Sequence, residues 1–429
     1  MRLPDPAPIA LSPPAPTAAR SAGLALALLT SLNLFNFVDR YVLAGVQPLV
    51  AREFSASDTQ MGTLSTAFFL TYMIAAPLTG WLGDRLPRKP LIVAGALLWS
   101  AATLLTATVH SYRSLLLRHA AVGIGEATFS IFAPALLADY YPEAERNRVL
   151  SVFYLCIPVG AALGYIAGGV LGPPLGWRAP FYLTALPGVL IAAAFSAWTH
   201  EPQRGSADRL APTFDRATLR GLARNPGYWL ASLGMALMVF SMGGISVWMP
   251  TFFFRYGGYS LPASTELLGG ITVVDGILGT LAGGWLAQIW LRRNHRALFL
   301  ISAWSALLTI PGALLAFFGP RPALAPAVPA AEFFLFLNTG PLNAAIVNAV
   351  AAPVRSTAIA INLFLIHALG DAFSPRLIGM VSDRSSLRVG LGVTVIALAF
   401  STATLLAGSR FAPVLGAEGG ASAGLEPAS

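Results

Sequence analysis

Charged residues are scarce in this sequence. Only 11% of its 429 residues are Asp, Glu, Lys or Arg, and 55% are hydrophobic. A soluble globular chain carries about 25% charged residues. The deficit excludes an ordinary soluble domain and predicts an integral membrane protein.

Several chemical motifs are also missing. Cys156 is the only cysteine, so the chain can form no internal disulfide and no cysteine-rich metal site. No GxxxxGK[ST] segment is present, which excludes a pump with a Walker-type ATP site. No sequence pattern of a catalytic nucleophile with a general base is evident. We therefore expect neither an enzyme nor a bound cofactor or metal.

Twelve long apolar runs are present instead. A membrane-spanning helix needs about 20 mostly apolar residues, and helices satisfy their own backbone groups in lipid. The runs therefore predict an all-α integral membrane protein with twelve transmembrane helices. The expected spans are 22–48, 58–82, 90–110, 112–138, 149–172, 178–199, 227–254, 264–290, 297–318, 329–351, 356–381 and 389–409.

The net charge of +8 comes from basic residues that lie between the apolar runs. Because basic loops favour the cytoplasm, their distribution predicts a multi-pass protein of the inner or plasma membrane with both termini in the cytoplasm. The basic residues form no stripe interleaved with aromatic residues, as a nucleic-acid surface would. We expect the lipid bilayer as a partner, and no nucleic acid.

The longest internal polar segment divides the spans into two groups of six. Within it, 214–223 could form a basic helix on the membrane surface or remain a solvated linker. The expected domains are a disordered tail over 1–21, a six-helix bundle over 22–199, a cytoplasmic linker over 200–226, a second six-helix bundle over 227–409 and a disordered tail over 410–429.

Two pairs of similar segments indicate an internal duplication. "GWLGDRLPRK" from Gly80 matches "GWLAQIWLRR" from Gly284, 204 residues later. "RVLSVFYLCIPVG" from Arg148 parallels "RSTAIAINLFLIH" from Arg355, 207 residues later. Repeated six-helix halves with a site between them are an architecture of transporters.

The first of these segments resembles the loop between helices two and three of the major facilitator superfamily, although Pro87 replaces a usual glycine. Within that superfamily the chain resembles the spinster subfamily, through "NFVDR" from Asn36, "RHAAVGIGEA" from Arg118, "PALLADYYPEAERNRVLS" from Pro134 and "RSTAIAINLFLIHALGDAFSPRLIGMVSD" from Arg355. The resemblance covers nearly the whole chain outside the tails and the linker. It implies two pseudo-symmetric six-helix bundles that work by alternating access, usually proton-linked, on lipid-like or amphipathic cargo.

Charged residues inside the first-half spans are candidates for proton coupling, because an ionisable group at membrane depth is costly. Arg118 and Glu126 lie on one face of a helix, about 12 Å apart along its axis. We expect Asp39 and Glu126 to bind and release the coupling proton and Arg118 to bias their titration. The alternative is a permanent ion-pair network that only fixes helix packing.

Arg40 follows Asp39 directly and lies about 100° away round the helix. It could pair with an acid on a neighbouring helix, contact a cargo head group or extend toward the membrane surface. Aligning the halves on Pro48 and Pro250 places Ser241 and Met242 opposite this pair. The second half thus lacks a copy, which predicts proton chemistry concentrated in the first half.

Other polar and aromatic residues in the spans are candidates for the substrate cavity. His367 and Asp371 lie four residues apart on one face of span eleven, where Pro375 predicts a kink. We expect His367 to be a packing residue rather than a proton acceptor. The further cavity candidates are Asn36, Ser130, Phe240, Trp248, Phe336 and Asn338.

Asp84, at the end of span two, predicts a cytoplasmic latch. In the implied fold this loop meets the start of span eleven, and a carboxylate is favourable at a helix N-terminus. The alternative is a basic loop that only sets the orientation. The other gating candidates are Gly80, Arg85, Arg88, Arg146, Arg148 and Arg355.

Gly160, Gly164, Gly168 and Gly172 recur every four residues in span five. Small residues on one face allow helices to approach closely. In the implied fold, spans five and eight meet between the two halves. We therefore expect this glycine face to pack against span eight.

We expect a monomeric secondary transporter that exports amphipathic or drug-like molecules in exchange for protons. A facilitator or symporter of sugars or organic anions is the main alternative, and it would need a more polar cavity than Phe240, Trp248 and Phe336 predict. A non-transporting membrane receptor or scaffold is a third possibility. It would have no need of intramembrane acids.

Overall fold

The computed structural model describes residues 16–83, 85–202, 216–350 and 355–413. Every regular element in these ranges is helical, and twelve helical segments are long and apolar enough to cross a membrane. The expectation of twelve membrane-spanning helices is therefore confirmed.

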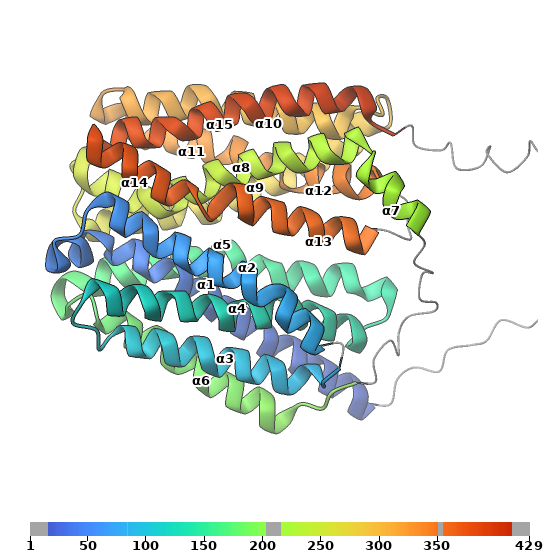
Figure 1. Ribbon diagram of the computed structural model, residues 1–429, viewed down its shortest axis with the longest axis horizontal. Coiled ribbons are helices and arrows are strands. Elements are labelled where there is room, and N and C mark those ends of the chain that lie inside the picture. Colours follow the sequence, from blue (N-terminus) through green and yellow to red (C-terminus); the bar gives the residue numbers. More distant parts are fainter. Residues whose placement is uncertain (1–15, 84, 203–215, 351–354, 414–429) are drawn as a thin grey trace, which may run out of the picture.

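The first half consists of six helices that pack as one bundle, drawn in blue to green in Figure 1. Its core contains the large buried rings of Trp99, Phe129, Phe153 and Phe195. The helices are α1 (Pro16–Phe54), α2 (Asp58–Gly83), α3 (Arg88–Thr106), α4 (Tyr112–Tyr140), α5 (Glu143–Leu175) and α6 (Ala179–Trp198).

The second half forms the other bundle, drawn in yellow-green to red in Figure 1. Four of its spans are composed of more than one helical element. The elements are α8 (Pro226–Phe252) with η1 (Phe253–Gly257), α9 (Leu261–Leu291), α10 (Ala297–Phe318), α11 (Arg321–Leu337) with α12 (Thr339–Asn348), α13 (Arg355–Ile366) with η3 (His367–Asp371) and α14 (Ser374–Arg384), and α15 (Leu387–Gly408) with η4 (Ser409–Phe411). Between the halves, α7 (Arg216–Ala223) shows that the linker contains the helix left open by the sequence.

The two ends of the molecule differ in what they hold. We call the end where α1 begins and η4 finishes the terminal end, at the right in Figure 1. The opposite end, where α1 finishes, α2 begins and α14 finishes, is the distal end.

Helices α1 and α11 are among those that begin earlier than expected. Helix α1 starts at Pro16, within the segment expected to be a disordered tail, and α11 starts at Arg321 rather than at residue 329. Both starts carry a proline in the first turn, where the missing N–H would have no helical partner anyway. The prolines had suggested loops, whereas here they begin helices.

Span eleven is broken near its middle. Gly370 has φ −101° and ψ −107°, far from helical values, within the π-helical turn η3. Helix α14 then restarts at Ser374 with Pro375 in its first turn, and the indole N–H of Trp248 donates to the Pro375 carbonyl at 2.9 Å. The break occurs just before the expected proline. The Trp248 hydrogen bond holds the start of α14, on the distal side of the break, against α8.

The glycine face of α5 packs against α1, so the expected partner was wrong. A Cβ at Gly164 would lie 2.6 Å from the carbonyl oxygen of Val38, and one at Gly168 would lie 2.5 Å from that of Val42. Contact between α5 and α9 instead uses Gly169, which faces Thr265. The regular glycines therefore tighten the first bundle, because the backbone of α1 lies directly against them.

The bundles meet closely at the distal end, where α2 packs against α14. A Cβ added to Gly62 would collide with the carbonyl of Pro375, and one added to Gly379 would collide with the carbonyl of Asp58. Backbone approaches backbone at both positions. The distal end of the described structure is therefore closed.

We predict that Gly62→Ala or Gly379→Ala destabilises the protein by about 1–3 kcal/mol, because the added methyl group overpacks this contact. Gly270→Ala is the matched control, since a Cβ there meets nothing within 4 Å. Thermal unfolding in detergent measures the effect. Equal melting temperatures for all three variants would show that the α2–α14 contact is loose.

Candidate functional site

Arg40 on α1 and Glu126 on α4 form an ion pair inside the first bundle. The Arg40 Nε and Nη2 atoms donate to one carboxylate oxygen of Glu126 at 3.0 and 2.6 Å. The Glu126 side chain is fully buried, and that of Arg40 is 17% exposed. Of the three alternatives for Arg40, the structure shows pairing with an acid on a neighbouring helix.

Aromatic rings surround the guanidinium of Arg40. Its Cζ atom lies 4.8 Å from the ring centroid of Phe37 and 5.0 Å from that of Phe68. Phe69 and Tyr72 follow at 5.9 Å each. Such rings attract a cation while excluding water. The ion pair therefore lies in a largely apolar setting with one face of Arg40 still accessible.

Asp39 points away from this pair, as its position round the helix requires. It lies beside Trp99 of α3 and Thr184 of α6, and it is near enough to Glu126 for the two acids to interact. The side chain is 3% exposed, and among the described residues Thr184 and Trp99 lie beside its carboxylate but outside ordinary hydrogen-bond geometry. Asp39 is thus buried within the first bundle without a cation of its own.

The arginine that contacts the first-half acids is not Arg118, whose expected role in their titration stays a prediction. Arg40, not Arg118, contacts Glu126. Arg118 lies about two turns closer to the distal end of α4 and forms no ion pair among the described residues. Its separation from Glu126 along α4 exceeds side-chain reach. A titration role for Asp39 and Glu126 stays a prediction.

Two cavities lie between the bundles. The central cavity, of about 110 Å³, is bordered by Arg40 and His119 of the first bundle and by Asp371 of the second. The apolar cavity, of about 100 Å³, extends among α5, α8, α9, α10 and α11. Tyr41 and Met242 line both cavities, so the two spaces adjoin.

Glu332 of α11 is an acid that the sequence reasoning missed. It lines the apolar cavity and accepts a hydrogen bond from the Thr272 hydroxyl at 2.7 Å. With span ten expected to begin at residue 329, Glu332 falls in the first turn of the expected helix, where a charge attracts no notice. Because α11 begins at Arg321, it lies three turns into the helix. Its separation of 206 residues from Glu126 could have revealed it.

His367 and Asp371 form a pair in the broken part of span eleven. The His367 Nδ1 atom lies 2.9 Å from the nearer carboxylate oxygen of Asp371. The imidazole also stacks on Phe69 of α2, with ring centroids 5.5 Å apart, and meets Tyr72 edge-on. His367 thus packs across the bundle interface, and Asp371 borders the central cavity.

The remaining cavity candidates have mixed positions. Phe336 lines the apolar cavity. Asn36 lies beside Glu126 and Ser130 beside Tyr72, behind the cavity wall. Phe240 is not among the residues that line either cavity. Trp248 and Asn338 are both buried, and each hydrogen-bonds a backbone carbonyl near a break in a span. The Asn338 amide donates to the Leu335 carbonyl where α11 gives way to α12.

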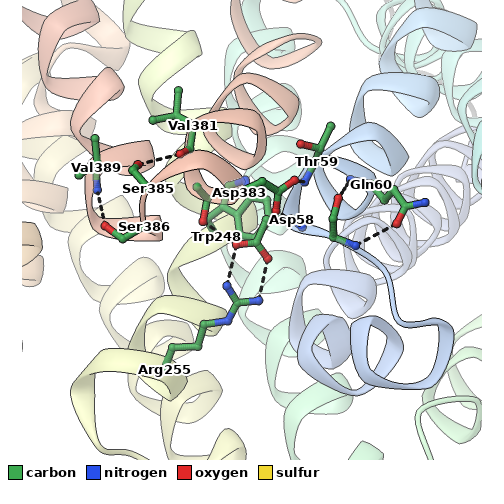
Figure 2. Close-up of polar contacts among 12 residues, drawn as sticks. Asp58, Thr59, Gln60, Trp248, Arg255, Val381, Asp383, Ser385, Ser386 and Val389 are labelled. Atoms are coloured by element: carbon green, nitrogen blue, oxygen red, sulfur yellow. Dashed lines mark hydrogen bonds and ion pairs between the residues drawn. The ribbon is translucent and has the colours of Figure 1, made fainter.

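A polar cluster closes the distal end, and we call it the distal latch (Figure 2). Arg255 of η1 binds both carboxylate oxygens of Asp58 at 2.7 Å. The Ser382 hydroxyl donates to Asp58 at 2.5 Å. Asp383 of α14 accepts from the backbone N–H groups of Asp58 and Thr59, each at 2.9 Å. One bundle therefore caps the first turn of a helix in the other.

Sequence reasoning overlooked the latch because its charged residues stand at the ends of spans. Charges there are ordinary for membrane helices and carry no signal of their own. Only the structure shows that Asp58 and Arg255, 197 residues apart, meet across the bundle interface.

The expected latch at the terminal end stays a prediction. Asp84 and the Arg355 side chain lie outside the described residues. Arg88 pairs with Asp139 in the first bundle, and the Arg146 Nε atom donates to the carbonyls of Ala138 and Tyr141 at 3.1 Å. Arg85 stacks on Trp81, Arg148 is exposed and a Cβ at Gly80 would meet nothing within 4 Å.

We predict that Arg40→Met lowers the stability by about 3–5 kcal/mol, because Glu126 would remain buried without its cation. Adding Glu126→Gln should restore most of the loss. Arg118→Met is the control and should change little. Thermal unfolding in detergent measures all four proteins. A large loss for Arg118→Met with little for Arg40→Met would contradict this pairing.

We predict that Asp58→Asn opens the distal end, because it weakens the bidentate contact with Arg255. Spin labels on Arg113→Cys and Arg384→Cys, in a Cys156→Ser background, report the separation of the bundles by electron resonance. The distance distribution should gain a longer component.

The matched control for the latch is Glu53→Gln. Glu53 binds Arg178 at the same end, but within the first bundle, at 2.6 Å. This variant should keep the original distribution. Identical distributions for both variants would show that the latch does not hold the bundles together.

Comparison with known proteins agrees with this architecture. The Major Facilitator Superfamily matches residues 29–375. Protein spinster homolog 1 of Bos taurus is 38% identical over 391 residues, covering 85% of this chain and 73% of that protein. The sphingosine-1-phosphate transporter SPNS2 of Danio rerio is 34% identical over 387 residues, covering 85% and 77%.

A solved structure supports the same fold. A bacterial homolog of the human lysosomal transporter Spinster, described as inward-facing and unoccupied, superposes with a TM-score of 0.83 at 22% identity, covering 91% of this chain and 98% of that one. Two bundles of six spans, cavities between them and these relatives lead to one assignment. The chain belongs to the spinster family of the major facilitator superfamily and is an alternating-access membrane transporter, not an enzyme.

Proposed function

We propose that this protein is a proton-coupled transporter that exports amphipathic or lipid-like molecules. The observation that carries the proposal is the buried pair of Arg40 and Glu126 at the edge of the central cavity, with the unpaired Asp39 behind it. Burying three ionisable groups at this depth is costly. An ion pair that only held the helices together would not need Asp39 as well.

The coupling step follows from the charge balance of these groups. Arg40 neutralises one carboxylate, so Glu126 and Asp39 together hold one charge more favourably than two. When a proton binds to Glu126, the attraction to Arg40 falls and the guanidinium is freed toward the central cavity. Loss of that proton draws Arg40 back. The protonation state thus changes what the cavity wall presents to the cargo.

The cavities favour amphipathic cargo. The apolar cavity is lined mainly by aliphatic and aromatic side chains such as Phe317 and Met249, whereas Arg40 and Asp371 border the central cavity. A molecule with an apolar chain and a charged head suits this pair of adjoining spaces. The name of the zebrafish relative, a sphingosine-1-phosphate transporter, agrees with such cargo. A sugar facilitator would need more hydrogen-bonding groups than these walls offer.

Neither cavity can hold a whole lipid in the described conformation. Ligand pockets for molecules of that size occupy about 300–1,000 Å³. We therefore propose that cargo enters when the bundles separate at the terminal end, while the distal latch keeps the other end closed. In the proposed orientation, the protein lies in the inner or plasma membrane with both termini in the cytoplasm. The conformation that is open at the terminal end then faces the cytoplasm. One chain forms the whole transport path, so the protein works as a monomer.

We predict that an imposed pH gradient drives flux in proteoliposomes for at least one of lysophosphatidylcholine, sphingosine, sphingosine-1-phosphate or a cationic drug. Asp39→Asn and Glu126→Gln should each abolish the gradient-driven component, because each removes a proton-binding group. Counterflow, exchange of labelled for unlabelled cargo without a gradient, should persist.

The matched control is Glu266→Gln, an exposed acid on α9 at the distal end. It should leave the gradient-driven flux unchanged. Full gradient-driven flux in both Asp39→Asn and Glu126→Gln would refute coupling through these acids.

A further inference from the structure

The internal repeat relates Glu332 to Glu126. The two acids are 206 residues apart, within the 204 to 207 residues that separate the matched segments of the two halves. Both lie on the helix that forms the fourth span of its half, α4 and α11. Glu332 is therefore the second-half counterpart of the ion-paired Glu126.

The two acids have different neighbours. Glu126 faces Arg40, whereas the position that matches Arg40 in the second half is Met242, which lines the apolar cavity. No Arg, Lys or His is among the residues that line this cavity. The single side-chain partner of Glu332 in the described structure is the Thr272 hydroxyl. Duplication has thus kept the acid and left out its cation.

A second acid stands beside Glu332. Asp275 lies three residues after Thr272 on α9, so both project from the same face of that helix. Asp275 is buried, with 8% exposure, and its Oδ2 atom has no hydrogen-bond partner in the part of the chain that the structure describes. The two carboxyl groups are close enough to influence each other. An unpartnered carboxyl oxygen at this depth requires a ligand or a proton.

The helices packed around Glu332 supply no compensating charge. Helix α9 contributes Asp275, α1 contributes Tyr41 and α5 contributes Tyr165. Helices α10 and α12 carry no ionisable residue, and the Arg255 guanidinium of η1 is bound to Asp58 at the distal end. Every ionisable side chain that faces this acid pair is therefore acidic or phenolic.

We propose that Glu332 and Asp275 form a second proton-binding site, which holds at least one proton in the described conformation. Two carboxylates without a cation in apolar surroundings would cost several kcal/mol, so at least one carboxyl group remains neutral. When the apolar cavity opens to water, that O–H bond breaks and the proton passes to a water molecule. The step reverses on closure. As a coupling site, the pair extends the proposed proton-linked transport and depends on it.

Infrared spectroscopy tests the proton directly. The purified Asp39→Asn/Glu126→Gln protein lacks the first-half acids, and at neutral pH it should still show the carbonyl stretch of a neutral carboxylic acid. Adding Glu332→Gln and Asp275→Asn together should remove that band. Adding Glu266→Gln, an exposed acid on the same helix as Asp275, should leave it unchanged. A band that survives both substitutions, or that is absent from the start, overturns the proposal.

Thr272→Ala gives an independent readout that keeps both acids. Loss of the hydroxyl removes a hydrogen bond from the Glu332 carboxyl group, so the band should shift to higher frequency rather than vanish. An unshifted band would mean that the neutral acid lies elsewhere. This variant retains every charged group, so it also serves where Glu332→Gln does not fold.

The flux ratio tests the coupling role. The gradient of cargo that balances a given pH gradient reports the number of protons moved per cargo molecule. Glu332→Gln should lower this number by one, and an unchanged number overturns the coupling role. If the unmodified protein shows no pH-driven flux, the proposed function fails, whereas the infrared band still decides whether the acid pair holds a proton.

Discussion

A charge buried at membrane depth must be neutralised by the protein itself, and this constraint orders the whole interior. The first half meets it with a cation, since Arg40 binds Glu126 and the surrounding rings exclude water. Among the described residues, the acid of the second half meets no such cation, and its side-chain partner is the Thr272 hydroxyl. Two copies of one ancestral bundle therefore solve the same electrostatic problem in different ways, on opposite sides of the adjoining cavities.

The bundles are joined by contacts that differ in kind from these interior charges. At the distal end the contacts are short, backbone to backbone at Gly62 and Gly379 and carboxylate to backbone at Asp383. Near the middle, the Tyr165 hydroxyl reaches the Ser246 carbonyl at 2.7 Å, and His367 stacks on Phe69. Span eleven takes part at both levels because the break at Gly370 lets its two segments follow different directions.

Much of the fold could be predicted from the sequence, because the length of a hydrophobic run is a local property. The starts of α1 and α11 could not, since proline suits a loop and a first helical turn equally well. The sequence indicated which ionisable residues lie inside the first bundle, but not which of them form an ion pair. Glu126 was recognised, but whether Arg40 or Arg118 reaches it depends on the tilt and rotation of α1 against α4, which no local pattern encodes. The packing partner of the α5 glycines was predicted wrongly for the same reason.

The cap that Asp383 places on α2 has a consequence for how the distal end opens. The first backbone N–H groups of a membrane helix normally find water or a local side chain, but here they find a carboxylate from the other bundle. Separation of the bundles therefore uncovers a helix end as well as breaking an ion pair. Losing such a cap costs about 0.5–2 kcal/mol. Part of the free-energy cost of separating the bundles is therefore the cost of uncapping α2. When the distal end opens, the first turn of α2 must either unwind or find another cap.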